Sequence, residues 1–209
     1  MLAIDHVVIA AKDPSQAAED FGQHYQVTTI QGGKHDNWGT YNYLAYFENE
    51  CYIEWIGIFD EVLAEKSANP LIQQVASALR NNHEGVIQFA LRTKNMDHYI
   101  EHFDAEQIAY TGPIPGSRHK PDGSTLQWRM LFPEPDIGIP FLIEWSEGKN
   151  MPQDERVLNK QHLRSIFFGV KDRELVKHIY QLDAVDGNVK LINGILHLEN
   201  NEKLDFELR

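Results

Sequence analysis

Apolar runs of strand length alternate along the chain with segments of helical spacing, and one such arrangement recurs. Residues 4–13, 86–95 and 163–172 each begin with an apolar run and close on Lys followed by Asp or Asn. Each run is followed by a segment whose apolar residues recur every three or four positions, and then by further strand-like runs. Because a supersecondary unit of this length cannot bury its apolar face alone, the pattern predicts related modules packed together.

The first two copies share one order of elements. Asp13 and Asn95 follow the repeated runs and are residue types that cap the start of a helix. Strand-like segments come after each helix, and both copies end in the tripeptide Ile-Glu-Trp, 90 residues apart. We therefore expect an α+β fold built on two tandem βαβββ modules, 1–58 and 85–146.

The remaining segments complete the predicted domain organisation. Residues 59–84 have apolar positions of helical spacing and are interpreted as a connector or lid within a paired domain, 1–146. The polar stretch 147–161 is predicted to be a hinge. The third copy, 162–209, is a shorter module in which an Asn-Gly pair predicts a hairpin, and its last strand places Glu207 where the earlier copies have their Glu.

The composition excludes several classes of protein. At 209 residues, with 42% hydrophobic and 24% charged side chains, the chain has the composition of a globular protein. No apolar run approaches the ~20 residues of a membrane span, and the first residues lack the basic start of a signal peptide, so we expect a cytoplasmic protein. A net charge of −12 disfavours nucleic acid and anionic membranes as partners and favours a small molecule. The sequence has no glycine-rich nucleotide-binding motif, and a single cysteine excludes an intrachain disulfide.

Polar residues interrupt the apolar strands at matching positions of the two modules. His6 and Gln88 are each the third residue of the repeated run, and Glu54 and Glu144 stand in the two Ile-Glu-Trp strands. Because side chains alternate along a strand, each of them shares a face with apolar neighbours and needs a polar partner there. One nitrogen and several oxygens around a pocket could hold a divalent metal with open positions. Each residue taken alone is equally compatible with a hydrogen-bonded core position.

Histidines and small polar residues gather in the loops that precede the middle strands. His35, Gly39, Thr40 and Asn42 lie in the first module, and His119 lies in the matching loop of the second. We interpret these five as ligand-contacting residues, although histidines in glycine-containing loops also serve to support a turn.

The paired modules, with a polar residue on the first strand and Glu on the last, resemble the vicinal oxygen chelate superfamily. The Gly-Lys-His loop of the first module is similar to that of its glyoxalase-like group. The resemblance covers about residues 1–146 and implies that the two modules form a curved-sheet cup. It also implies that a metal is held by the first and last strands of each module, here His6, Glu54, Gln88 and Glu144. Gln88 departs from the two His and one Glu of the iron-dependent extradiol dioxygenases, which argues against ring cleavage.

The resemblance implies Lewis-acid chemistry on a small molecule with two adjacent oxygens. A bound Ni, Co, Zn, Mn or Fe ion would polarise a carbonyl, and Glu144 or Glu54 would act as the base. The leading hypothesis is a metal-dependent isomerase or lyase of the glyoxalase type, without a nucleotide cofactor. The alternative is a metal-free protein that sequesters a small molecule in the same cup. Because a third module alone leaves an apolar sheet face, it should pack on the first two modules or on another chain, and we expect a homodimer.

Overall fold

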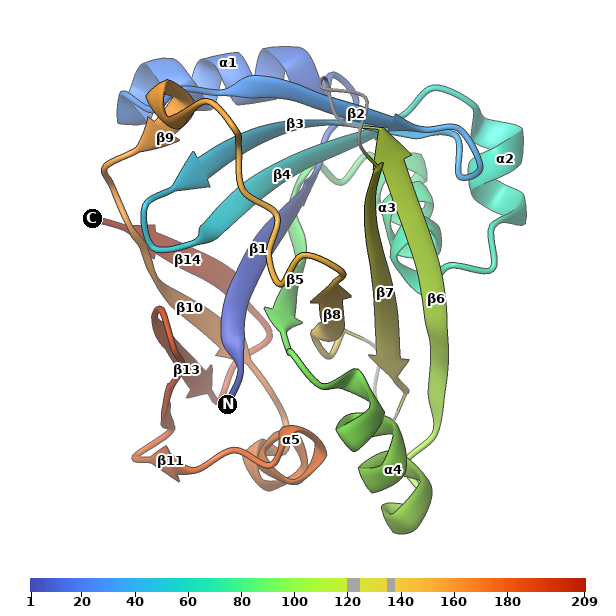
Figure 1. Cartoon of the computed structure of the whole chain (residues 1–209), viewed down its shortest axis with the longest axis vertical. Helices are drawn as coiled ribbons and strands as arrows, with labels where there is room; N and C mark the ends of the chain where they lie inside the picture. Colours follow the sequence, from blue (N-terminus) through green and yellow to red (C-terminus); the bar gives the residue numbers. More distant parts are fainter. Residues whose placement is uncertain (120–124, 135–137) are drawn as a thin grey trace.

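The computed structural model describes residues 1–119, 125–134 and 138–209. Within this part of the chain, the strands form a strongly curled sheet of nine strands and a second sheet of five (Figure 1). Helices lie on the outside of the curled sheet and also within its hollow.

The first module follows the predicted order of elements. Its helix begins where expected, since the Asp13 side chain accepts a hydrogen bond from the Gln16 backbone N–H at 3.1 Å and proline occupies the first turn. The bounds are β1 Ala3–Ala10, α1 Pro14–Tyr25, β2 Ile30–His35, β3 Thr40–Phe47 and β4 Cys51–Ile58.

The second module repeats this order and completes the curled sheet. Asn95 caps its helix by accepting from the His98 backbone N–H. The bounds are β5 Gly85–Arg92, α4 Met96–Glu106, β6 Tyr110–His119, β7 Thr125–Pro133 and β8 Phe141–Trp145. The strand order is β2-β3-β4-β1-β5-β8-β7-β6, with β1 antiparallel to β5 at the centre. The predicted α+β fold of two βαβββ modules is confirmed.

Alternation along the strands separates two hydrophobic cores. On β1, Val8 packs into the core inside the curl, while Val7 packs into the core on the outer, convex face. β2 and β6, the two edges of the curled sheet, contact each other. The sheet therefore closes into a nearly complete barrel around the inner core.

The connector between the modules lies inside the curl. It forms α2 Glu61–Lys66 and α3 Pro70–Arg80, and α3 contacts β1, β4 and β5. Leu71, Ile72 and Val75 of α3 are buried in the inner core. The segment interpreted as a connector or lid thus fills part of the cup. None of the described helices is long and apolar enough to span a membrane.

The second sheet is a complete third module followed by one further strand. The bounds are β10 Leu163–Gly169, α5 Arg173–Tyr180, β11 Ala184–Val185, β12 Asn188–Lys190, β13 Ile195–Glu199 and β14 Leu204–Leu208. β13 runs parallel to β10, as β4 does to β1, and so closes the module. β14 is antiparallel to β10, as β5 is to β1. We expected Glu207 on β14 to occupy the position of Glu54. That prediction is wrong, because the register gives this position to His197 of β13.

The third module packs on the convex face of the curled sheet. Ile166 and Phe168 share a core with Phe89 and Leu91 of β5. The Asn193 side chain bonds both the N–H and the C=O of Ile4, at 2.8 and 2.9 Å. The apolar face of this module is thus covered within the chain, which is one of the two arrangements expected.

The segment predicted to be a hinge is bonded to the first sheet instead. It contains a short 3₁₀ turn, Glu155–Val157, and β9 Leu158–Asn159, which pairs with β3. Asn159 donates to the Tyr46 carbonyl at 2.9 Å, and Asn150 is buried near the cup. These bonds fix residues 147–161 across the first module, so the segment is not a free hinge.

Candidate ligand site in the cup

A cavity of about 40 Å³ lies inside the curled sheet. Its walls come from strands β1 to β4 and β6 to β8 and from α3, so it lies within the cup. The walls are largely apolar and aromatic. The polar side chains at the cavity are His6, His35, Asn42, Glu54, Arg118 and Asn150.

His6 is fixed at the cavity by a fully buried carboxylate. Its Nδ1 lies 2.7 Å from Oδ1 of Asp5, and Asp5 Oδ2 accepts from the Trp145 indole N–H at 2.9 Å. Arg92 lies 3.4 Å from the same Oδ2 and balances the charge. The imidazole stacks on Tyr52 at 4.6 Å. With Nδ1 held by Asp5, Nε2 is the ring nitrogen that faces Glu54.

Glu54 forms the second part of the polar group. Its Oε2 lies 3.5 Å from His6 Nε2, and its Oε1 accepts from the Asn42 side-chain amide. Asn42 in turn accepts from the Gly33 backbone N–H at 2.7 Å. His6, Asn42 and Glu54 are all more than nine-tenths buried. Three of the residues singled out in the sequence therefore meet in one buried cluster.

Two residues at the cavity were not predicted. Arg118 of β6 donates to Asn150 Oδ1 at 3.2 Å, and the Tyr46 hydroxyl donates to the same oxygen at 3.2 Å. Asn150 comes from the segment that we interpreted as a hinge. Asp5, which orients His6, was also missed, although its position next to His6 is visible in the sequence.

The predicted loop residues separate into two groups. His35 Nδ1 lies 3.0 Å from the Thr40 hydroxyl, and the imidazole lines the cavity. Burial lowers the pKa of His35, an effect that the carboxylate of Glu54 opposes and Arg118 reinforces.

Gly39 does not line the cavity. It has φ +67° and its carbonyl accepts from Phe59 and Asp60 next to α2, so it shapes the hairpin. His119 ends β6, and its side chain lies outside the described part of the structure.

Gln88 faces the inner core, but its amide is turned into local hydrogen bonds. Its Nε2 donates to the Ile139 carbonyl at 3.0 Å and lies 3.4 Å from Gln74 Oε1 of α3. Its Oε1 accepts from the Phe89 backbone N–H at 2.9 Å. Both ends of the amide are thus engaged away from His6 and Glu54.

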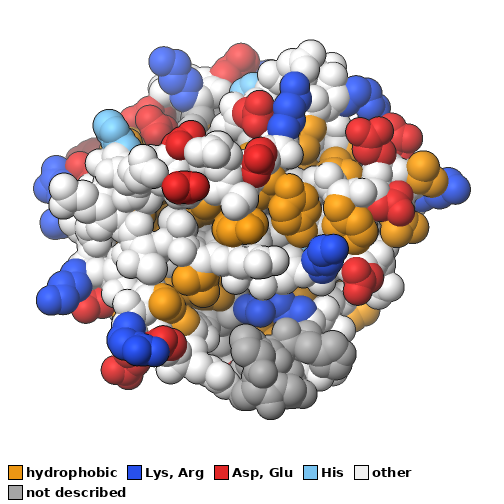
Figure 2. Space-filling model, turned by 90° about the horizontal axis from the view of Figure 1, so that it is seen from above, with side chains coloured by type: hydrophobic (Ala, Val, Ile, Leu, Met, Phe, Trp, Pro, Cys, Tyr) orange, Lys and Arg blue, Asp and Glu red, His pale blue; other side chains and the backbone are white. Residues whose placement is uncertain are grey.

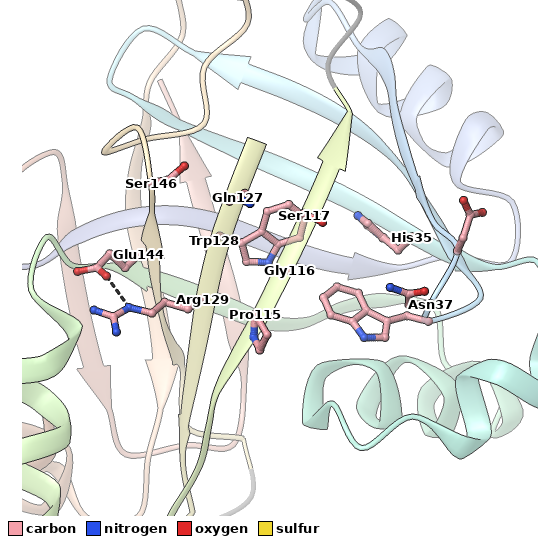
Figure 3. A pocket seen from close by; sticks show the side chains of 12 residues that line it. His35, Asn37, Pro115, Gly116, Ser117, Gln127, Trp128, Arg129, Glu144 and Ser146 are labelled. Atoms are coloured by element: carbon pink, nitrogen blue, oxygen red, sulfur yellow. Dashed lines mark hydrogen bonds and ion pairs between the residues drawn. The ribbon is translucent and has the colours of Figure 1, made fainter. Parts of the chain in front are cut away.

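Glu144 lies on the opposite face of the sheet. Its Oε1 accepts from the Met96 backbone N–H at the start of α4, and its Oε2 accepts from Arg129 Nε at 2.6 Å (Figure 3). Phe141 and Trp145, on alternate positions of the same strand, belong to the inner core. Trp55, in the Ile-Glu-Trp tripeptide of the first module, packs instead into the core on the convex face.

The strand register explains the position of Glu144. On β4, Glu54 pairs with Val8; the matching residue of β5 is Ala90, which pairs with Phe141. The structural counterpart of Glu54 is therefore Phe141, whose ring lies 5.6 Å from His6. A shift by an odd number of residues turns a side chain to the other face. The repeated Ile-Glu-Trp tripeptide is thus out of structural register between the modules.

The four predicted metal ligands do not assemble into one site. His6 and Glu54 are adjacent, Gln88 is bonded elsewhere and Glu144 faces away. Among the described residues, no group of three or more His, Cys, Asp or Glu side chains is arranged to hold a metal ion. The donor set therefore does not fit the four-ligand centre that the sequence predicted.

A larger open pocket of about 620 Å³ lies on the outer side of β6, β7 and β8 (Figure 3). It contains the Arg129–Glu144 ion pair at one end and the hairpin of residues 35–38 at the other. His35, Trp38 and Trp128 border both this pocket and the inner cavity. These three side chains therefore form the wall between the cup and the outside.

Sequence and structure comparisons place this arrangement in a family. A model described as a glyoxalase-like domain matches residues 4–182, so the chain belongs to the glyoxalase-like domain family, within the vicinal oxygen chelate superfamily. The match extends past the second module into β10 and α5 of the third. No curated protein matches the sequence.

Solved structures share the fold at low sequence identity. A hypothetical protein from Staphylococcus aureus has a TM-score of 0.79 at 19% identity, over 99% of this chain and 89% of its own. A methylmalonyl-CoA epimerase in complex with methylmalonyl-CoA has a TM-score of 0.50 at 18% identity, over 71% of this chain and 97% of its own. A hypothetical protein from Bacillus halodurans has a TM-score of 0.51 at 16% identity, over 74% and 98%. These likenesses show the fold.

Proposed function

We propose that the protein binds a small molecule in the cup, with His6, Asn42 and Glu54 contacting its polar end. The observation that carries this proposal is the buried cluster of these three side chains at an aromatic-walled cavity. Burying an imidazole, an amide and a carboxylate together is costly unless they are hydrogen-bonded. Such convergent polar groups in an apolar hollow are typical of ligand sites.

Binding requires movement of α3 or of the wall. The cavity of about 40 Å³ has room for about one water molecule. Leu71 and Ile72 of α3 line the same cavity and fill the space that a ligand would need. We therefore propose that the connector acts as a lid, in accordance with one of our interpretations of the sequence.

Of the two hypotheses from the sequence, the geometry favours the metal-free binding protein. The metal-dependent isomerase or lyase stays a prediction, supported by the 3.5 Å between His6 Nε2 and Glu54 Oε2, which suits two ligands of one ion. Metal analysis of protein purified without chelator decides between them. A stoichiometric metal that disappears in His6→Ala would favour the enzyme.

The proposed site is tested by a thermal-shift screen of small molecules, run with and without divalent ions. The stabilisation by such molecules should change in Glu54→Gln, falling for cationic ligands and rising for anionic ones, because the substitution removes the negative charge at the cavity. Glu144→Gln is the matched control on the outer face, where the effect should persist. Ligands whose effect changes in Glu144→Gln and stays at the wild-type level in Glu54→Gln would place the site in the outer pocket instead.

The other predictions about partners concern association and location. The apolar face that suggested a homodimer is covered within the chain. The homodimer stays a prediction, and size-exclusion chromatography with light scattering tests it. On the face seen in Figure 2, basic side chains are scattered among acidic ones rather than gathered in one patch. This distribution supports a small molecule over nucleic acid as the partner. A cytoplasmic location likewise stays a prediction.

A further inference from the structure

The two charged side chains at the cavity have unequal partners. Glu54 is engaged on both oxygens, by Asn42 and by His6. Arg118 is bonded to the neutral amide oxygen of Asn150, and no carboxylate among the described residues lies within ion-pair distance of it. A guanidinium carries five N–H donors in a planar fork that matches a carboxylate. The cavity therefore has donors and a positive charge to offer to an anion.

The walls around this charge suit a flat apolar group. Trp128 and Trp145 lie with their ring centroids 5.2 Å apart, and Tyr52 and Phe141 lie against His6. Aromatic faces and edges of this kind pack well against a planar ring. An engineered apolar cavity of about 150 Å³ accommodates benzene, far more than the ~40 Å³ free here.

The missing volume is occupied by α3. Leu71 and Ile72, the residues after its first-turn proline, enter the aromatic-walled cavity from the concave side. Both are almost fully buried, and they supply apolar atoms where a ring-sized group would lie. These side chains thus compete with a ligand for the same space.

We infer that the cup selects a small organic anion with a planar apolar body, bound through Arg118, with the body replacing Leu71 of α3. The inference rests on the proposed function and names the ligand class of that site. Arg118 is then the specificity-determining residue, and Leu71 is the group that a ligand displaces.

Calorimetric titration with benzoate and its neutral analogue benzamide tests the inference. Leu71→Ala should bind benzoate about tenfold or more tightly than the wild type, because the competing side chain is shortened. In that variant benzoate should bind about tenfold more tightly than benzamide, and adding Arg118→Gln should abolish this preference while benzamide binding persists. Leu63→Ala, on exposed α2, and Arg80→Gln are the matched controls and should change neither affinity.

The outcomes separate this inference from the proposed function. Equal affinities for benzoate and benzamide in Leu71→Ala would overturn the choice of an anion, yet binding in the cup would stand. Binding of neither probe, with circular dichroism showing a folded variant, would overturn both. If Leu71→Ala fails to fold, Ile72→Val removes a single carbon from the same wall and should show the same anion preference, lost again on Arg118→Gln.

Discussion

At the scale of single residues, Glu54 and Glu144 show how the same side chain in the same tripeptide acquires two roles. Glu54 is buried beside an imidazole and an amide, whereas Glu144 is partly exposed and holds the start of a helix. The difference lies in the surroundings: Glu54 lies among aromatic walls, and Glu144 is paired with the Arg129 guanidinium. Of the two, Glu54 is therefore the residue that faces the proposed ligand site, and Glu144 contributes to stability.

Glu144→Gln should lower the free energy of unfolding by about 1 kcal/mol, because it weakens charge-assisted bonds to Arg129 and Met96. Urea unfolding measures this change. Glu101→Gln, on the exposed face of α4, is the control and should leave stability within about 0.5 kcal/mol of the wild type. An unchanged midpoint for Glu144→Gln, together with loss of ligand or metal binding, would return this residue to the functional site.

The sequence identified the residues that meet in the cup only in part. His6 and Glu54 were predictable from strand alternation among apolar neighbours, and Asn42 from the small polar residues around His35. The structure brings these three side chains together. Arg118 and Asn150 were missed because their position depends on how β6 and the segment 147–161 approach the first module. No local pattern reports an approach between segments so far apart in sequence.

At the scale of elements, the order of strands and helices was predictable but their register was not. Periodicity and helix caps identify the order of elements in each module. Asp13, Asn95 and Asp172 each accept a hydrogen bond in the first turn of their helix. The pairing of Phe141 with Ala90, in contrast, joins two strands that are far apart in sequence, and no local pattern predicts it. The matching tripeptides therefore gave a wrong alignment of the last strands of the two modules. The position predicted for Glu207 on β14 was wrong because strand pairing cannot be predicted from a local pattern.

One side chain, Asn193, connects the third module to β1 by several hydrogen bonds. Asn193 bonds the backbone of Ile4 on both sides and the Asn49 carbonyl. Asn193→Ala leaves these groups without their partners and should cost about 2–3 kcal/mol. Chemical denaturation measures the loss. Asn188→Ala, on the exposed side of the same module, is the control, and equal effects of the two changes would show that the link is not specific.

At the scale of the whole molecule, the third module and the curled sheet share one core. Phe168 of β10 packs edge-on against Phe89 of β5 with ring centroids 5.3 Å apart, and both belong to the convex-face core. A module that buries its apolar side in a shared core loses that burial when its neighbour unfolds. The domain boundary predicted between residues 146 and 162 stays a prediction, which the unfolding of the two parts tests.

This shared core predicts that the two sheets unfold together. The four tryptophans all lie between residues 38 and 145 and so report on the first sheet, whereas far-ultraviolet circular dichroism reports on both. In urea the two signals should give the same midpoint. Phe168→Ala should lower both midpoints by the same amount, corresponding to about 3–5 kcal/mol, because the cavity opens in the core common to both sheets. A dichroism change that precedes the fluorescence change would mean that the third module unfolds by itself, and the curled sheet would then be an independent domain on whose convex face that module is only docked.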